Sequence, residues 1–408
     1  MQKKLIAMAV AGLVSGAAFA QSNVTVYGVM DATWESYKTT DCTDPGTGCT
    51  NIASHSRLAS DSSYLGFKGS ESLGNGLTAV FQFETGINAD TGGWAGARDT
   101  MVALAGSFGT VAAGNLTGPV RALGAAVDFN LGVTTAGFTG SMYGEVAGLK
   151  TGVDDRSPNT IAYISPTFSG LYGVVAYQNG TPSSDATSVN KDSHLWTLGL
   201  IYNNGPIFAG FGYVDANRPS VVGAVLGQAA AGNATRYTGT TGAATLAGDL
   251  TSILGTTVTT ADAQAILDTE DSLKNYRLAG KYSFPFGLTI SALWDNQKYT
   301  AGGLEAKRNA YMLGGNYGFG ANNVWLQYAV AKDLTSNVCD ILTCGETGAK
   351  QMTLGYSYSF SKRTMTHAFY SRITNDKYVA YDNYVNGINN TAVGADSTVY
   401  GLGLRHTF

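Results

Sequence analysis

Residues 398–408 read Thr398-Val-Tyr-Gly-Leu-Gly-Leu-Arg-His-Thr-Phe408, with two faces that alternate strictly along the stretch. One face carries Tyr400, Leu402, Leu404, His406 and Phe408, and the other carries Val399, Gly401, Gly403, Arg405 and Thr407. This period of two predicts a β-strand, and a chain that ends within a strand leaves an exposed edge unless the edge meets a partner. The partner we expect is the chain's own first strand, which would close the sheet into a barrel. In a membrane, a closed barrel is one of two structures that satisfy every backbone N–H and C=O group.

The first strand-like stretch, residues 24–34, alternates in the same way. Its outward face would hold Val24, Val26, Met30 and Trp34. Asp31 falls on the other face and would therefore point into the lumen of a membrane barrel. A hairpin follows at residues 64–84, with Lys68 and Glu84 on its inner face and a short Gly-Asn-Gly connection between its strands.

The N-terminus predicts export from the cytoplasm. Residues 1–20 combine Lys3 and Lys4, a short apolar core and the small-residue end Ala18-Phe19-Ala20, which is typical of a secretory signal peptide. We therefore expect a mature chain that starts at Gln21 and forms a single barrel over residues 21–408. No later stretch reaches the roughly 20 apolar residues that a transmembrane helix needs, so a membrane-embedded chain would have to span by strands.

Composition agrees with a membrane barrel but does not decide the question. The chain has 53 Gly, 23 Tyr and only 13% charged residues, whereas soluble domains carry about 25%. Loss of residues 1–20 would change the net charge from −4 to −6, which gives no electrostatic support for a nucleic-acid partner. A secreted all-β protein with a polar core fits the same composition.

Connections of two lengths alternate along the chain. Short turns are predicted at 107–109, 167–170, 203–206, 284–287, 318–323 and 361–363. Longer segments are predicted near 38–56, 87–97, 117–155, 180–193, 216–272, 298–308, 333–349 and 375–397. Short periplasmic turns and long extracellular loops are typical of outer-membrane barrels, and they separate sixteen strands here. The predicted fold is therefore all-β, a sixteen-stranded antiparallel transmembrane β-barrel of a size that holds an aqueous channel.

Two of the long segments stand out. Segment 216–272 contains Ala-rich pieces, and Thr259-Thr-Ala-Asp262 before an apolar run predicts a short capped helix. A surface insertion without a specific ligand is the explanation of this segment that we favour. Segment 117–155 is the third long connection, and a loop longer than about 15 residues is usually functional or disordered.

The four cysteines lie in two close pairs inside turn-rich segments. Their spacing predicts two local disulfides, Cys42–Cys49 and Cys339–Cys344, in an oxidising compartment. A zinc site built from the same four thiols is the alternative, but neither pair has the tight spacing of structural zinc motifs. The sequence otherwise indicates no metal and no cofactor.

Several motifs together resemble the trimeric general porins of Gram-negative outer membranes, most closely the neisserial and burkholderial type. They are Val24-Thr-Val-Tyr-Gly28, Gly66-Phe-Lys-Gly-Ser-Glu-Ser-Leu-Gly74, Leu104-Ala-Gly-Ser-Phe-Gly-Thr-Val111, Gly355-Tyr-Ser-Tyr-Ser-Phe-Ser-Lys-Arg-Thr364 and Gly401-Leu-Gly-Leu-Arg-His-Thr-Phe408. The resemblance covers the mature chain and implies an outer-membrane homotrimer surrounded by lipid. It also implies that the third loop, residues 117–155, folds inward to narrow the pore. Phe408 would be the signal that the outer-membrane insertion machinery reads.

The resemblance also assigns residues to the constriction. Lys68, Arg98 and Arg156 match basic residues of the pore wall, Glu84 matches an acidic pore residue, and Asp128 occupies an acidic position of the third loop. We expect these cations to face the two acids and to create a transverse field across the narrowest point. For each charge, an ion pair that only holds the wall or the loop in place is the alternative.

Departures from the family pattern affect the expected selectivity. Tyr64 stands where relatives often have arginine, Asn115 replaces another basic residue, and Asp99 follows Arg98 where a second arginine is common. Because these changes reduce the positive charge, we expect at most weak charge selectivity.

The sequence therefore predicts a porin through which small hydrophilic solutes and ions diffuse passively. A substrate-specific outer-membrane channel is the alternative, motivated by the 216–272 insertion. An enzyme is not expected, because none of His55, His194, His367 and His406 accompanies a nucleophile motif.

Overall fold

The structure, a computed structural model, describes residues 23–42, 51–133, 135–146, 148–150, 152–180, 194–217, 272–301, 304–337, 344–383, 387–388 and 394–408. The predicted signal peptide at 1–20, the insertion within 216–272 apart from its two ends, and the cysteines Cys49 and Cys339 lie outside these residues. No helix among the described residues is long and apolar enough to cross a membrane.

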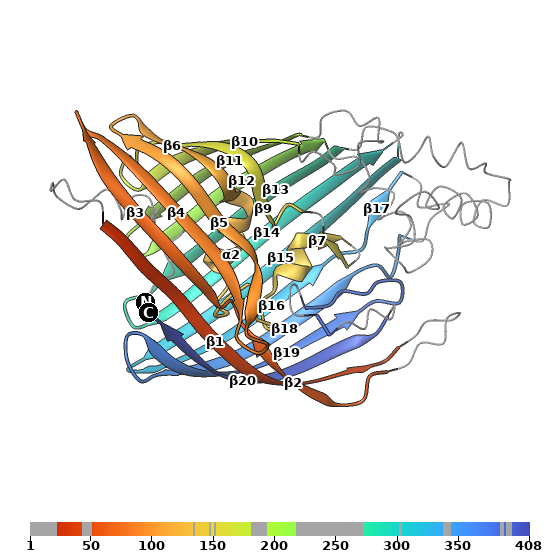
Figure 1. Cartoon of the computed structure of the whole chain (residues 1–408). Helices are drawn as coiled ribbons and strands as arrows, with labels where there is room; N and C mark the ends of the chain where they lie inside the picture. The colour runs from red at the N-terminus through yellow and green to blue at the C-terminus, as the bar shows by residue number, and fades with distance from the viewer. Residues whose placement is uncertain are drawn as a thin grey trace.

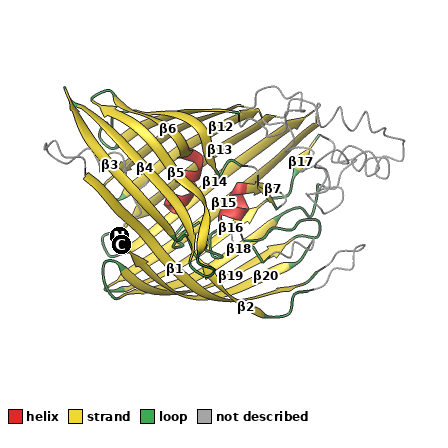
Figure 2. Ribbon diagram, in the orientation of Figure 1, coloured by secondary structure: helices red, strands yellow, loops and turns green. Residues whose placement is uncertain are grey.

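The described chain consists mainly of strands (Figures 1 and 2). Those of the first half are β1 (Asn23–Thr40), β2 (His55–Ser60), β3 (Tyr64–Gly74), β4 (Leu77–Asn88), β5 (Gly93–Gly106), β6 (Gly109–Thr117), β7 (Glu145–Val146), β8 (Leu149–Lys150), β9 (Arg156–Ile164), β10 (Leu171–Asn179), β11 (His194–Asn204) and β12 (Ile207–Asn217). Those of the second half are β13 (Ser272–Ser283), β14 (Leu288–Ala301), β15 (Leu304–Phe319), β16 (Asn322–Ala331), β17 (Thr335–Ser336), β18 (Ala349–Ser359), β19 (Thr364–Asn375) and β20 (Asp396–Thr407). The described helices are α2 (Pro119–Val127) and α3 (Gly140–Gly144).

The sheet closes on itself, as the two ends of the sequence predicted. The register of β1 with β20 pairs Asp31 with Arg405 and Trp34 with Leu402, while the other edge of β1 pairs with β3 and β2. Among the described residues the sheet contains eighteen strands, but β2 and β3 share one position beside β1, and β16 and β17 share one position beside β15, so the barrel has sixteen antiparallel strand positions. The start of β1 and the end of β20 lie at the same end of the barrel, on the left in Figure 1.

The two faces of each strand meet different surroundings. Trp34, Leu402 and Leu404 point outward with 56–63% of their surface exposed, whereas the neighbouring Asp31 and Val399 are buried inside the barrel. The predicted facing of the first and last strands is therefore confirmed. A soluble sandwich would show the reverse pattern, with the apolar face buried.

Two connections are shorter than the sequence indicated. Strand β4 continues to Asn88 and β5 begins at Gly93, so the predicted long segment 87–97 is mostly strand. Likewise, β14 reaches Ala301 and β15 starts at Leu304. The ends of these strands are polar and Gly-rich, and they resemble loops in the sequence. Strand ends that extend beyond the lipid do not need alternating apolar residues.

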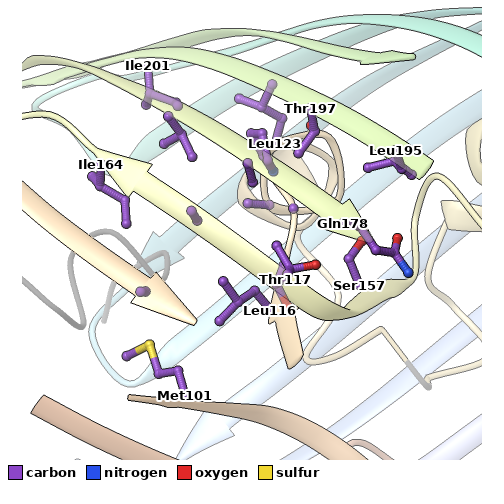
Figure 3. Close-up of a pocket in the computed structure, with 18 of the residues that line it drawn as sticks. Met101, Leu116, Thr117, Leu123, Ser157, Ile164, Gln178, Leu195, Thr197 and Ile201 are labelled. Atoms are coloured by element: carbon purple, nitrogen blue, oxygen red, sulfur yellow. The ribbon is translucent and has the colours of Figure 1, made fainter. Parts of the chain in front are cut away.

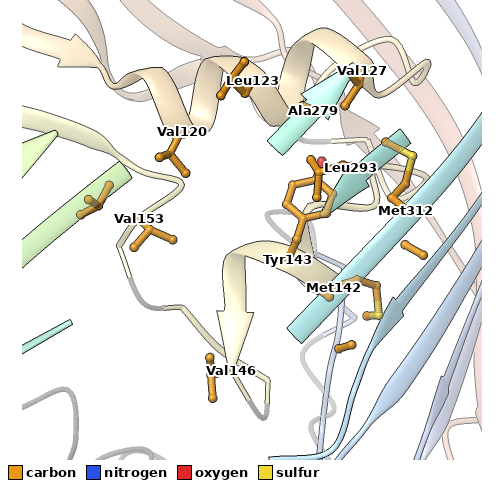
Figure 4. Packing of buried hydrophobic residues seen from close by; sticks show 14 of the residues in the cluster. Val120, Leu123, Val127, Met142, Tyr143, Val146, Val153, Ala279, Leu293 and Met312 are labelled. Carbon is orange, nitrogen blue, oxygen red and sulfur yellow. The ribbon is translucent and has the colours of Figure 1, made fainter. Parts of the chain in front are cut away.

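Residues 118–155 leave the wall after β6 and fold into the lumen, where they include both α2 and α3 (Figure 2). Pro119 occupies the first turn of α2, where its missing N–H costs no helical hydrogen bond. The largest apolar core lies between this loop and the wall, and Leu123, Val127 and Tyr143 of the loop share it with Leu293 and Met312 of the strands (Figure 4).

Candidate pore constriction

The third loop is bonded to one side of the barrel through the end of α2. Lys281 Nζ donates to the carbonyl of Ala126 at 2.6 Å, and Ser291 Oγ donates to the carbonyl of Val127 at 2.8 Å. These carbonyls belong to the last turn of α2, where carbonyl groups have no N–H donors within the helix. A cation there also complements the helix dipole, so β13 and β14 hold this end of the helix.

A buried charge network fixes the rest of the loop to the same wall. Arg277 of β13 binds both carboxylate oxygens of Asp154, at 2.6 and 3.2 Å, and its Nε donates to Asp295 at 2.8 Å. Arg308 of β15 reaches the other oxygen of Asp295 at 3.1 Å. Both arginines also donate to the carbonyl of Tyr143, each at 3.0 Å. The sequence analysis missed Arg277, Asp295 and Arg308. The signal available was a charged residue on the inner face of each of three consecutive strands.

Amide and hydroxyl groups extend this attachment along β16 and β18. Gln327 accepts from the backbone N–H of Phe129 at 3.0 Å, and Thr353 donates to the carbonyl of Gly137 at 2.8 Å. Asp128 accepts from the backbone N–H and hydroxyl of Thr139, at 3.0 and 2.7 Å, and from Asn130. The loop is therefore held on one side of the lumen.

The opposite wall carries the basic residues that the sequence predicted, grouped around one carboxylate. Glu84 accepts from Tyr27 at 2.8 Å, from Gln82 at 3.0 Å and from Arg98 at 3.2 Å. The guanidinium of Arg98 lies over the Tyr64 ring, 4.5 Å from its centroid. Tyr64 therefore supports this cation, as cation–π geometry allows.

Lys68 and Arg156 extend this basic wall on both sides. The Lys68 ammonium lies 4.9 Å from the centroid of Tyr27. Arg156 of β9 pairs with Asp99 at 3.3 Å, and Asp99 also accepts from the backbone N–H and hydroxyl of Thr117, at 3.0 and 2.8 Å. Asp99 therefore binds the base of the third loop as well as a neighbouring cation.

An open space of about 510 Å³ lies between this wall and the third loop. Its charged lining residues are Arg98 and Arg156 of the wall and Arg121, Lys150 and Asp155 of the loop. Ser60, Ser62, Ser63 and Asn88 add polar groups from the wall. This polar space is the candidate constriction, and Arg121 and Lys150 bring loop cations to face the wall cations.

Acids and bases of the wall differ in depth. The carboxylate side chains of Asp31 and Glu35 are fully buried, whereas their partners Arg405 and Arg57 keep 14% and 25% of their side-chain surface exposed. Glu84 is likewise less exposed than Arg98, at 9% against 17%. The wall is nearly balanced in charge, but the surface that it presents to the lumen is mainly cationic.

The expected arrangement of acids opposite bases is wrong in two respects. Glu84 lies on the same wall as Arg98 and is bonded to it. Asp128 is 5% exposed and its carboxylate is used inside the third loop, so it does not oppose the wall cations at the surface. Asp31 faces inward as expected and binds His367 and Arg405, each at 2.9 Å.

One acid of the third loop is buried without full compensation. Glu145 is 4% exposed, and burial raises its pKa well above the ordinary value of 4.5, with nearby Asp382 acting in the same direction and Lys150 and Arg308 opposing it. Because charged carboxylates are costly to bury, protonated Glu145 is favoured in the folded loop.

Behind α2 lies a second, apolar cavity of about 70 Å³ (Figure 3). Leu123 of the helix, Met101 and Leu116 of the wall, and Ile164 and Ile201 of the neighbouring strands line it. A void of this kind leaves α2 less tightly packed here than at its bonded end.

The cysteines are described only in part. Cys42 and Cys344 are both disulfide-bonded, and no described cysteine is free. The predicted partners Cys49 and Cys339 lie outside the described residues, so the pairing stays a prediction. The described residues contain no group of three His, Cys, Asp or Glu side chains that could hold a metal ion.

Comparison with known proteins places this geometry in context. A family described as Gram-negative porin matches residues 7–378. Outer membrane porin protein 32 of Delftia acidovorans is 28% identical over the full length of both chains, and a porin of Bordetella pertussis is 27% identical over the full length of both. The major outer membrane protein P.IB of Neisseria gonorrhoeae is 34% identical over 212 residues, and the chain spans 56% of that relative's length.

Solved structures show the same fold. An anion-selective porin from Comamonas acidovorans superimposes with a TM-score of 0.66 at 23% identity, over 95% of this chain and 100% of that one. A trimer form of OmpT, an outer membrane protein of Vibrio cholerae, gives a TM-score of 0.62 at 15% identity, over 95% of this chain and 99% of that one.

Proposed function

The chain belongs to the Gram-negative porin family of the outer membrane, and we propose that it forms a water-filled channel for passive diffusion of small hydrophilic solutes and ions. The observation that carries this proposal is the polar space of about 510 Å³ between the basic wall and the third loop. Its charged lining sets a local potential and its width sets a size limit. The family consists of channels rather than enzymes.

The charge selectivity should be weak and should favour anions. Buried carboxylates neutralise most of the wall charge, which limits the selectivity. The space is lined by four cations, Arg98, Arg156, Arg121 and Lys150, and by one carboxylate, Asp155, and this excess of positive charge favours anions over cations. The porin from Comamonas acidovorans with the same fold is anion-selective, which agrees with this sign.

Single-channel recording in planar lipid bilayers tests the proposal. General diffusion predicts ohmic steps that no solute class blocks, and reversal potentials in a salt gradient that favour anions only slightly. Saturable block by one class of solute would instead support the substrate-specific channel. A purified, correctly folded protein that gives no conductance would contradict both functions.

We also propose that the protein is a homotrimer joined through β20, β1 and β3–β5. The outward face of these strands exposes many aliphatic residues, such as Val24, Val26, Val102 and Leu402, and its described aromatic residues include only one exposed tyrosine, Tyr400, beside Trp34, Phe81, Phe83 and Trp94. The outward face of β13–β18 carries Tyr276, Tyr282, Tyr311, Tyr317, Tyr328, Tyr356 and Tyr358, and aromatic residues of this kind are typical of lipid-facing girdles. A trimeric form is known for OmpT.

Bulky substitutions on the two faces test this interface. Val102→Trp should prevent close subunit packing and shift the purified protein from trimer to monomer in native mass spectrometry. Leu326→Trp, at a similarly exposed outward position of β16, should leave the trimer intact because lipid adapts to the larger ring. Equal trimer content in both variants would place the interface elsewhere.

A further inference from the structure

Three small residues lie side by side on the outer face of the barrel. The register pairs Ala209 of β12 with Gly280 of β13, and Gly280 with Ala292 of β14. They alternate with Phe208, Ala279 and Leu293, which are buried inside the barrel, so all three belong to the outward face. They form a continuous floor across three adjacent strands.

Large apolar side chains border this floor on both sides. One border contains Leu200, Phe211, Leu278, Trp294 and Tyr311, which are cross-strand neighbours in that order. The other border contains Ile207, Tyr282 and Ile290. Tyr202 and Leu313 close the two ends of the floor. The floor, the border from Leu200 to Tyr311 and the two end residues line an open apolar trough of about 670 Å³.

The trough lies near the short-turn end of the barrel. Ala209 is the third residue of β12, and Gly280 precedes the turn at 284–287 by only a few residues. With about 3.3 Å per residue and strands tilted by roughly 45°, the floor lies within about 10 Å of the turns along the membrane normal. This depth corresponds to the acyl region of the leaflet next to the short turns.

We infer that this trough is a binding site for one acyl chain of a phospholipid in that leaflet. Three adjacent strands make the floor about 10 Å long, and a row across tilted strands also lies about 45° from the normal. A chain lying there would touch the floor and both borders. Lipid tails are as apolar as leucine, so the hydrophobic effect does not favour one occupant over another inside the membrane. The fit of shapes and the van der Waals contacts therefore select the occupant.

A second copy of the protein is the other possible occupant of the trough. The proposed trimer excludes a second copy, because the subunits of that trimer meet through other strands. In the ring of strands, β13 lies half a turn away from β3 and β4. If subunits meet through β20, β1 and β3–β5, the trough faces away from the threefold axis. It therefore faces lipid.

The wall is only one backbone thick at this point. Ala279, Leu293 and Met312 alternate with the trough residues and pack inside the barrel against the third loop, in one cluster with Tyr143 (Figure 4). A bound acyl chain would therefore support, from outside, the part of the wall that carries the loop.

Gly280→Leu fills the trough without disturbing the wall. A Cβ atom at Gly280 would meet only the carbonyl oxygen of Phe208, at an ordinary 3.4 Å. Gly315→Leu is the matched control, because Gly315 also faces outward on β15, lies beyond the trough, and has no atom within 4 Å of an added Cβ. Neither residue belongs to the constriction.

The probe is a phosphatidylethanolamine with a photoreactive diazirine on its acyl chain, in vesicles that contain the purified protein. After illumination, peptides of β12–β14 should carry about threefold to tenfold more label than peptides of other strands, since packing alone gives modest preferences. Gly280→Leu should reduce this excess to the background level, and Gly315→Leu should not. Uniform label over all strands, or an excess that survives Gly280→Leu, would overturn the inference.

Two further measurements separate the lipid site from the proposals on which it rests. Labelling that is low in the trimer and rises in the Val102→Trp monomer would show that a second subunit covers the trough, which also overturns the inference. Conductance recorded from the same Gly280→Leu protein reports channel function independently. An open channel without selective labelling would contradict the lipid site alone.

Discussion

At the scale of single residues, depth decides which charges act on a passing ion. Arg98 and Glu84 are bonded partners, but the guanidinium is nearer the lumen surface than the carboxylate. A sequence predicts that both residues lie on the inner face, because alternation along a strand is regular. It does not predict which of two inward charges is covered by the other, because that depends on side chains from neighbouring strands such as Tyr27 and Gln82.

Neutral substitutions of this pair should change selectivity in opposite directions. At about 6 Å in water, one unit charge contributes about 0.7 kcal/mol, or roughly a threefold change in permeability ratio. Arg98→Gln should lower the anion-to-cation ratio by up to about this factor, and Glu84→Gln should raise it. Reversal potentials in a salt gradient measure both effects.

Lys307→Gln is the control for this pair, because Lys307 is 47% exposed and pairs with Glu305. It should leave the ratio unchanged. If Arg98→Gln and Glu84→Gln shift the reversal potential in the same direction, the proposed cationic surface is wrong.

Glu145 predicts a pH dependence of the third loop. Its raised pKa means that the folded loop binds more protons than the unfolded loop at pH values above about 4.5. Local stability should therefore be greatest in acid and should fall as the pH rises through the raised pKa. Hydrogen exchange of residues 144–150, corrected for the intrinsic rate, should show stronger protection in acid than at neutral pH.

The Glu145→Gln variant should lose most of this difference because it cannot ionise. The Asp90→Asn variant, which changes an exposed acid, should retain it. Protection that increases with pH in the unmodified protein would contradict the sign of the shift.

At the scale of elements, the third loop behaves as part of the wall to which it is bonded. Its existence and boundaries, residues 117–155, could be predicted because a strand pattern stops after β6 and resumes at β9. Its attachment could not, because Arg277, Asp295 and Arg308 lie more than 100 residues away in sequence from the loop. The position of Asp128 was predicted wrongly because its partner Thr139 becomes a neighbour only after the loop has folded.

Removing the central arginine of this attachment should widen the pore. Arg277→Met leaves Asp154 and Asp295 buried without their main partner, and breaking a buried ion pair costs about 3–5 kcal/mol. We expect the loop to lose its fixed position and become less ordered, so that it no longer keeps the constriction narrow, and single-channel conductance to become larger and noisier. Liposome swelling should show a larger size limit for uncharged sugars.

Lys274→Met provides a control on the same strand, because Lys274 is 45% exposed and 3.9 Å from Asp215. It should leave conductance unchanged. Asp295 keeps its pair with Arg308 when Arg277 is replaced, so adding Asp154→Asn to Arg277→Met removes the carboxylate that has lost its pair with Arg277 and should restore part of the normal conductance. Unchanged conductance in Arg277→Met would show that the other contacts of the loop hold it without this arginine.

At the scale of the whole molecule, closure of the barrel could be predicted because the first and the last strand both alternate in the sequence, and each has one edge that its neighbour in the sequence does not cover. The sixteen strands were predicted from short turns, whose Gly and Asn residues are strong local signals. The exact loop lengths were not, as at 87–97 and 298–308, because strands continue beyond the membrane where no lipid imposes an apolar pattern. The outer trough also escapes prediction, since its floor depends on the register of three strands.

The closing contact explains why the last residue should matter for assembly. Phe408 exchanges two backbone hydrogen bonds with Gly28, at 3.1 and 3.2 Å. Its ring lies where a Cβ atom of residue 28 would be, 2.6 Å from the ring carbon Cζ. Phe408 thus completes the ladder between the two ends of the chain, in addition to its proposed role as the signal for the insertion machinery.

These two roles predict different results for two variants. Deletion of Phe408 removes both the signal and the contact, whereas Gly28→Val keeps the signal and disturbs only the contact, because a side chain there would also meet the carbonyl of Tyr64. We expect the deletion to reduce the amount of folded, heat-modifiable protein in the outer membrane more strongly than Gly28→Val. The few pores that do form from the truncated chain should conduct normally, because Phe408 lies at the barrel end and not at the constriction. Equal losses would assign the effect to closure alone, and normal assembly of the truncated chain would remove both roles.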